Sequence, residues 1–102
     1  ADIHAASKNG RTAFILAAQS GHLEVVRLLL DMGASVHNAD KDGTTGLRMA
    51  SLNGHLEVVR LLLDSRADPN RADEDGTTGL QMASQDGHLE LVRLLLDSRA
   101  DP

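Results

Sequence analysis

A segment that occurs three times, almost unchanged, constrains the fold of this chain more than any other feature. Residues 21–31 read Gly-His-Leu-Glu-Val-Val-Arg-Leu-Leu-Leu-Asp, residues 54–64 repeat them, and residues 87–97 differ only by a leucine in place of the first valine. The copies begin 33 positions apart (54 − 21 and 87 − 54). A period of about 20–50 residues is typical of proteins built from stacked structural repeats. The sequence therefore predicts one array of repeated units.

The pattern within the segment explains why each copy needs neighbours. Glu24, Arg27 and Asp31 follow the spacing i, i+3 and i+7, so they form one narrow polar stripe on a helix. Apolar residues cover most of the remaining circumference, and stacking identical copies encloses such a helix on two sides. We interpret the polar stripe as a solvated helix face. Charges interrupt each apolar run well before the roughly 20 residues that a bilayer span requires.

Composition argues against several classes of function. The formal net charge of the 102 residues is −5, which disfavours a dedicated nucleic-acid or membrane surface. Cysteine is absent, so disulfides and thiolate chemistry are excluded. Phe14 is the single aromatic residue, and the chain lacks tryptophan and tyrosine, which are enriched at binding hot spots. We therefore expect an aliphatic core.

Each repeated segment is preceded by a shorter amphipathic stretch that begins after a threonine. Thr12, Thr45 and Thr78 are expected to be N-caps, because a threonine hydroxyl can accept a hydrogen bond from a free amide of the first turn. Gly33 is expected at a helix C-terminus with positive φ. We expect little strand, at most isolated pairing between successive turns. The predicted helices span 13–20, 22–31, 46–53, 55–64, 79–86 and 88–97.

The combined pattern resembles a known repeat family. Asp-x-x-Gly-x-Thr-x-Leu-x-x-Ala, then Gly-His-Leu-Glu-Val-Val-Arg-Leu-Leu-Leu and Ala-Asp, is similar to the ankyrin repeat and covers essentially the whole chain. The resemblance implies an all-α solenoid of stacked helix-turn-helix units with projecting hairpin-like loops. It also implies a concave groove lined by the first helices and the loop tips. The expected organisation is a single array over 1–102, with units at approximately 1–33, 34–66 and 67–99 and the start of a further repeat at 100–102.

The same resemblance implies a use. Ankyrin-repeat proteins resemble one another as non-enzymatic scaffolds that bind other proteins, and the resemblance favours an intracellular protein. Because the chain begins and ends inside a repeat, we expect it to be an excerpt of a longer array. Its last repeat carries the same apolar flank as the interior ones, so self-association through uncapped terminal repeats is also expected. The alternative function is a structural spacer or self-associating segment.

Departures from the family pattern predict a less stable array than an idealised one. The Thr-Pro-Leu-His string of the family is replaced by Thr-Gly-Leu-Arg at 45–48 and by Thr-Gly-Leu-Gln at 78–81. Glycine gives up the preset φ of proline and increases the entropy of the unfolded chain. The glycine at position 33 becomes Arg66 and Arg99 in the later repeats, where a Cβ in the left-handed conformation costs about 1 kcal/mol.

The recurring histidines do not predict a metal centre. His22, His55 and His88 lie one period apart, and helices in stacked repeats are about 10 Å apart, whereas zinc–nitrogen bonds are about 2 Å long. We expect each histidine to close its own inter-helix turn. No Ser, His and Asp set stands apart from the period and no phosphate-binding glycine motif occurs, so we expect neither catalysis nor a cofactor.

Candidate partner-binding residues are those that differ between repeats while the framework stays constant. At the loop tips the charge runs from basic in the first repeat to acidic in the third. This variation is either a recognition surface of graded charge for another protein or neutral drift of exposed loops. The candidates are Lys8, Asn9, Arg11, Gln19, Lys41, Asp42, Thr44, Arg48, Leu52, Asn53, Glu74, Asp75, Thr77, Gln81, Gln85 and Asp86.

Overall fold

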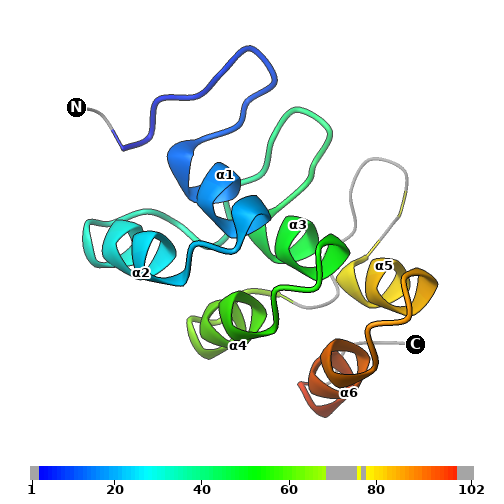
Figure 1. Cartoon of the computed structure of the whole chain (residues 1–102). Coiled ribbons are helices and arrows are strands. Elements are labelled where there is room, and N and C mark those ends of the chain that lie inside the picture. Colours follow the sequence, from blue (N-terminus) through cyan, green and yellow to red (C-terminus); the bar gives the residue numbers. More distant parts are fainter. Residues whose placement is uncertain (1–2, 69–75, 77, 99–102) are drawn as a thin grey trace.

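Six helices in two parallel rows form the part of the chain that the structure, a computed structural model, describes: residues 3–68, 76 and 78–98 (Figure 1). One row contains the first helix of each repeat, and the other contains the second. The first helices pack against one another along their row, as the second helices do. The expected all-α repeat solenoid is thus confirmed. The rows are α1 (Ala13–Ser20), α3 (Gly46–Leu52) and α5 (Gly79–Gln85), and α2 (Leu23–Asp31), α4 (Leu56–Asp64) and α6 (Leu89–Asp97).

The helix bounds agree with the sequence prediction to within one residue. Each second helix begins one residue later than expected, because His22, His55 and His88 are N-caps with non-helical backbone angles. Two first helices end one residue earlier, since Asn53 and Asp86 are their C-caps.

Threonine caps begin all three first helices, as predicted. The Oγ1 atom of Thr12 accepts the Ile15 amide at 3.4 Å, and Thr45 accepts the Arg48 amide at 3.2 Å. Thr78 caps α5 in the same way, and the Gln81 side chain also accepts the Thr78 amide at 2.9 Å, which completes a capping box. Since a cap contributes about 1 kcal/mol, these contacts offset part of the cost expected from glycine at the next position.

A left-handed residue ends the second helices of repeats one and two. Gly33 has φ 100°, and Arg66 has φ 71° although it carries a Cβ. In both repeats the amide of the following alanine bonds at 2.9 Å to the carbonyl five residues earlier, the pattern of a Schellman motif. The predicted left-handed conformation is confirmed for both residues. Arg99, the third position, lies outside the described residues.

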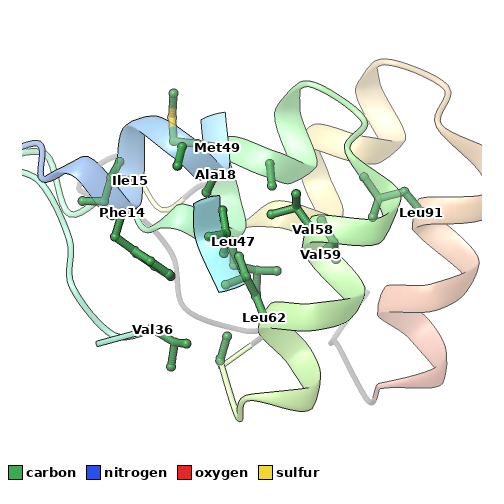
Figure 2. Packing of buried hydrophobic residues seen from close by; sticks show 14 of the residues in the cluster. Phe14, Ile15, Ala18, Val36, Leu47, Met49, Val58, Val59, Leu62 and Leu91 are labelled. Carbon is green, nitrogen blue, oxygen red and sulfur yellow. The ribbon is translucent and has the colours of Figure 1, made fainter. Parts of the chain in front are cut away.

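The core consists of aliphatic side chains from both rows, with Phe14 at its N-terminal end (Figure 2). Gly46 lies against this phenylalanine. A Cβ at residue 46 would lie 3.1 Å from Cε2 of Phe14 and 3.2 Å from Cβ of Ala18. The interpretation of Gly46 as a simple cost is therefore incomplete: the missing side chain lets α3 approach the preceding repeat. Val59 and Leu62 of α4 are buried in the same core.

Hairpin-like loops, here called fingers, project from the same end of the first helices (Figure 1). The first finger spans 3–12 and the second spans 34–45. Each contains one isolated antiparallel bridge, Ala6 with Thr12 and Ala39 with Thr45. A single backbone hydrogen bond among the described residues joins the two fingers, from the Lys41 amide to the Asn9 carbonyl at 2.9 Å. The expected pairing thus lies within each finger as well as between fingers.

Candidate protein-interaction surface

The tips of the first two fingers and the adjoining sides of the first helices form the candidate surface, called the finger-side surface below. Lys8, Asn9, Lys41 and Asp42 are exposed at the tips. They present three polar or basic side chains and one carboxylate to solvent. Glu74, Asp75 and Thr77, the third set of predicted tip residues, lie outside the described residues.

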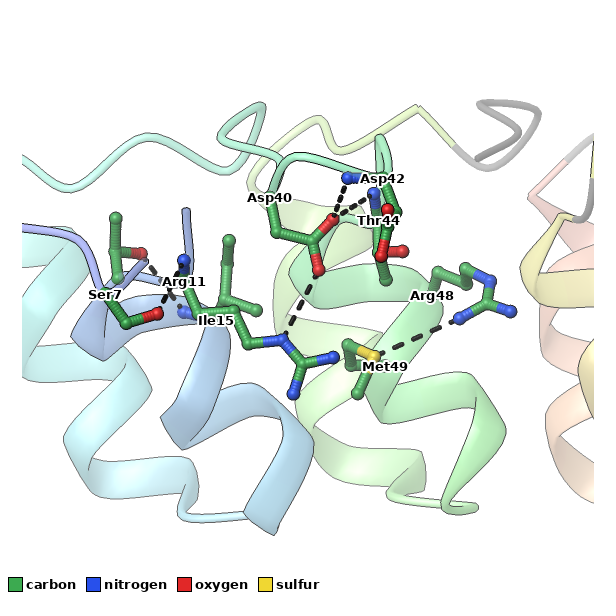
Figure 3. A network of polar contacts seen from close by, with 9 residues as sticks. Ser7, Arg11, Ile15, Asp40, Asp42, Thr44, Arg48 and Met49 are labelled. Carbon is green, nitrogen blue, oxygen red and sulfur yellow. Dashed lines mark hydrogen bonds and ion pairs between the residues drawn. The ribbon is translucent and has the colours of Figure 1, made fainter. Parts of the chain in front are cut away.

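A buried carboxylate holds the second finger in shape and joins it to the first repeat (Figure 3). The side chain of Asp40 is 1% exposed. Its Oδ1 atom accepts the amides of Asp42 and Thr44, both at 2.9 Å, and its Oδ2 accepts Nε of Arg11 at 3.4 Å. Burial alone raises the pKa of Asp40, but the amides of Thr44 and Asp42 and the guanidinium of Arg11 outweigh it, so the pKa lies below the ordinary 3.8.

Two of the predicted partner-binding residues therefore have framework roles. Thr44 is 4% exposed, and its amide is bound to the Asp40 carboxylate. Arg11 is half-buried and forms the ion pair that links the first repeat to the second. In the first two fingers, the exposed tip residues are therefore more accessible to another protein than Arg11 and Thr44 are.

The first helices contribute a second part of the surface. Arg48 and Leu52 are half-buried and lie one turn apart on α3, and Nη1 of Arg48 is 4.0 Å from the sulfur of Met49 (Figure 3). On α5, Gln81 and Gln85 are exposed, although the Gln81 side chain also takes part in the capping box. Arg48 and Leu52 thus combine a cation and an apolar side chain in the middle repeat.

The remaining candidates border the turns between paired helices. Gln19 is half-buried, and its carbonyl accepts Nδ2 of Asn53 at 2.8 Å and lies 3.0 Å from Nε2 of His55. Asn53 and His55 therefore tie repeat two to repeat one. Asp86, the equivalent of Asn53 in repeat three, is exposed, and its Oδ2 lies 3.9 Å from Nε2 of His88.

The role predicted for the histidines is corrected by this geometry. His55 does not only close its own turn, because its ring reaches the carbonyl of Gln19 in the preceding repeat. The ring also covers Gly21: a Cβ there would lie 2.5 Å from Nδ1 of His55. His88 covers Gly54 in the same way, at 2.8 Å. Each of these histidines packs on the turn glycine of the repeat before it.

Comparison with known families decides the identity of this architecture. A family model described as ankyrin repeats (three copies) matches residues 1–73 and 33–102, and so covers the whole chain. The chain belongs to the ankyrin-repeat family. Ankyrin repeats are in general protein–protein interaction modules, and the family is generally non-enzymatic. A comparison with curated proteins finds no match.

The ankyrin framework here depends on contacts that the sequence pattern did not assign. Asn53 was predicted only as a variable surface residue, and Asp40 only as the aspartate of the repeated Asp-x-x-Gly pattern. That pattern contained a signal for Asp40, because an aspartate that begins a turn commonly accepts backbone amides. Its pairing with Arg11 had no local signal, since the two residues are 29 positions apart.

The described residues contain no group of three or more His, Asp or Glu side chains arranged to hold a metal ion. Within the same residues, none of the helices combines the length and apolar character that crossing a bilayer requires.

Proposed function

We propose that this ankyrin array is a non-enzymatic scaffold that binds another protein through its finger-side surface. The supporting observation is that one group of side chains holds neighbouring repeats together, while another group is exposed at the finger tips. Residues such as Asp40 and His55 are engaged in contacts between repeats, whereas Lys8, Lys41 and Asp42 at the tips are exposed. Side chains that differ between repeats and face solvent are available to specify a partner.

The charge of the described surface favours an acidic partner segment over the first two repeats. Lys8 and Lys41 stand at successive tips, and Arg48 lies on the middle first helix. An arginine offers a planar set of donors that suits a carboxylate, and arginine is among the residue types enriched at hot spots. Leu52, one turn from Arg48, would contribute apolar contact. Complementary charge contributes mainly to the association rate and to specificity.

Charge reversal at the tips tests this proposal. The tagged chain captures its partner from an extract of its source, and the capture is repeated with the double variant Lys8→Glu, Lys41→Glu. Both side chains are exposed, so the fold should persist, which circular dichroism verifies. We expect the variant to lose the partner, and raised salt to weaken capture by the unaltered chain. The matched variant Arg27→Glu, Arg60→Glu makes the same charge change on α2 and α4 and should retain it. Equal capture by the tip variant and the unaltered chain would exclude this surface.

A structural role is the second candidate, and a different observation favours it. All of the large apolar side chains that are exposed in the described residues belong to the first and third repeats. Exposed apolar side chains such as Leu28 and Leu96 are suited to contact with another repeat or with a second copy of the chain. The two candidate functions use different surfaces, so variants of the finger tips distinguish them. If the chain is a protein-binding scaffold, these variants abolish capture of the partner. If it is a self-associating segment, they leave self-association intact.

A further inference from the structure

Asparagine is followed directly by glycine at two places in the sequence, Asn9–Gly10 and Asn53–Gly54. This dipeptide is chemically reactive, because the glycine nitrogen can attack the side-chain carbonyl carbon of the asparagine and glycine has no Cβ to obstruct the approach. Both asparagines are exposed. Their surroundings differ, and the difference decides which of the two reacts in the folded protein.

The side chain of Asn53 is held by the preceding repeat. Its Nδ2 atom donates to the Gln19 carbonyl at 2.8 Å, and the amide of Gly54 donates to the Ser51 carbonyl at 3.2 Å. The ring of His88 packs on Gly54, where a Cβ would lie 2.8 Å from Cε1 of that ring. Attack at Asn53 therefore requires the turn, the side-chain hydrogen bond and the contact with repeat three to open together.

Asn9 lies at the tip of the first finger, where fewer contacts oppose the reaction. The amide of Gly10 donates to the Ser7 carbonyl at 2.9 Å, so the turn must open before the nitrogen can attack. The exposed side chain of Asn9 forms no hydrogen bond with any residue that the structure describes. Asp42, its equivalent in the second finger, is exposed although the first finger lies beside it. Exposure is thus a property of this finger position, not of the place of repeat one in the array.

The same turn is held more firmly in the second finger (Figure 3). There Oδ1 of the buried Asp40 accepts the amides of Asp42 and Thr44, both at 2.9 Å. Ser7 takes the place of Asp40 in the first finger, and its Oγ atom accepts the amide of Arg11 at 3.3 Å in an exposed position. Local opening of the first tip, which precedes any attack, therefore requires less free energy than opening of the second.

We infer that Asn9 is a modification site at which the folded chain deamidates spontaneously. The nitrogen of Gly10 loses its proton to a base in the solvent and attacks Cγ of Asn9. A bond forms between this nitrogen and Cγ, the bond from Cγ to Nδ2 breaks, and ammonia leaves with a proton from the solvent. The product is a cyclic succinimide. This chemistry needs no partner and lies outside the proposed binding function.

Water then opens the succinimide in either of two ways. Cleavage of the bond between Cγ and the ring nitrogen gives aspartate, so that residues 8–10 become Lys-Asp-Gly, the string that the second tip carries at 41–43. Cleavage at the main-chain carbonyl carbon gives isoaspartate, which adds a carbon atom to the path of the main chain. The carbonyl of residue 9, which accepts the Lys41 amide at 2.9 Å, then leaves that path. Isoaspartate, unlike aspartate, therefore disrupts the hydrogen bond between the fingers.

Incubation of the folded chain at mildly alkaline pH tests the site. Cleavage after glutamate places Asn9 in fragment 1–24 and Asn53 in fragment 25–57, and mass spectrometry measures the replacement of an amide by a carboxyl group. We expect Asn9 to convert at least about fivefold faster than Asn53, which has the additional side-chain hydrogen bond. In urea the two rates should become similar. Equal rates in the folded chain, or faster conversion of Asn53, would overturn the inference.

Substitutions at position 7 test whether the contacts of the tip control the rate. Ser7→Asp introduces the acceptor that Asp40 provides in the second finger, and should slow conversion of Asn9 about fivefold to tenfold. Ser7→Ala removes the existing acceptor and should accelerate conversion. Ser7 is exposed, so both variants should fold, which circular dichroism verifies. Rates that neither substitution changes would contradict control by the finger. Asn9→Gln is the assignment control, and fragment 1–24 should then remain unconverted.

The isoaspartate product provides a second measurement. Chromatography separates it from the aspartate product, and hydrogen exchange of the Lys41 amide is compared between the two. This amide should exchange about twofold to tenfold faster in the isoaspartate form, because its acceptor has moved. Asn9→Asp is the matched control, since it has the added charge and an ordinary main chain, and it should protect the Lys41 amide as the unaltered chain does. Equal protection in the three forms would refute the predicted disruption between the fingers.

Discussion

The imidazole ring of His55 occupies the space that a side chain on Gly21 would need. Gly21 has φ 74°, and a Cβ on it would lie 2.5 Å from Nδ1 and 2.7 Å from Cε1 of that ring. The same ring stands 3.0 Å from the Gln19 carbonyl. One histidine therefore fixes both the conformation of the preceding turn and the distance between repeats one and two.

The cost of a side chain at this turn can be separated from the cost of its backbone conformation. Gly21→Ala combines left-handed strain with a clash against the His55 ring, and should lower the free energy of unfolding by about 2–4 kcal/mol. Gly33→Ala is the matched control, because φ is 100° and nothing lies within 4 Å of its added Cβ. It should cost only about 1–2 kcal/mol. Urea denaturation of both variants measures the difference, and equal losses would mean that the ring moves aside freely.

Arg66→Gly should stabilise the array by about 0.5–1 kcal/mol, because glycine removes the strain of a Cβ at φ 71°. The loss of a positive charge at the C-terminus of α4 opposes this stabilisation by about 0.3 kcal/mol. Denaturant midpoints of the two proteins decide the sign. Arg66→Ala provides the control, since it removes the charge and keeps the Cβ. It should not stabilise.

Asp40→Asn should lower the free energy of unfolding at neutral pH by about 1–3 kcal/mol, because a buried carboxylate that accepts two amides and an arginine becomes a neutral amide. The pKa of Asp40 is lowered in the folded protein, so its contribution is complete above the ordinary value of 3.8. It is lost as the pH falls through the lower, folded value. The stabilities of the two proteins should therefore converge below pH 3.8 in denaturation measured across acidic pH. A difference that is constant with pH would show that the charge is not the cause.

Binding energy on the finger-side surface should be concentrated in the middle repeat. Arg48→Ala with Leu52→Ala should weaken partner binding by about 1–3 kcal/mol if both act as anchors. The matched change, Glu57→Ala with Arg60→Ala, removes an exposed pair 3.9 Å apart on α4 and should leave binding nearly unchanged, because exposed pairs contribute little. Titration calorimetry with the captured partner compares them. A larger loss from the α4 pair would place the partner on the other side of the array.

Much of the fold could be predicted from the sequence because its signals are local and repeated. Thr45 indicates the start of a helix because its hydroxyl can cap the first turn, and Gly33 indicates the end of one because glycine readily adopts positive φ. Even the unusual Arg66 was predictable, since its position in the period is that of Gly33. The periodic apolar pattern then determines which helix faces are covered, so architecture follows without any long-range information.

Contacts between unlike residues of neighbouring repeats could not be predicted in this way. The Asn53 side chain donates to the Gln19 carbonyl, and Arg11 donates to Asp40. Neither pair of residue types recurs one period later, so the repeated pattern of the sequence does not indicate these contacts. Gly46 appeared unfavourable when only its helix was considered, because the compensating partner, Phe14, lies 32 positions earlier (46 − 14). For the same reason, the sequence could nominate Thr44 as a tip residue but could not reveal that it is buried.

The contact between Asn53 and Gln19 has a consequence for the order in which the array opens. At the next junction the equivalent residue is Asp86, and a carboxylate accepts hydrogen bonds but cannot donate one to a carbonyl. The first junction is therefore held by a clamp that the second lacks. Since the stability of a linear array is a sum of units and nearest-neighbour couplings, we expect the absence of this contact to weaken the coupling of α5 and α6 to repeat two. Amide hydrogens of repeat three should exchange with solvent before those of repeats one and two, which gives the molecule a preferred direction of unfolding.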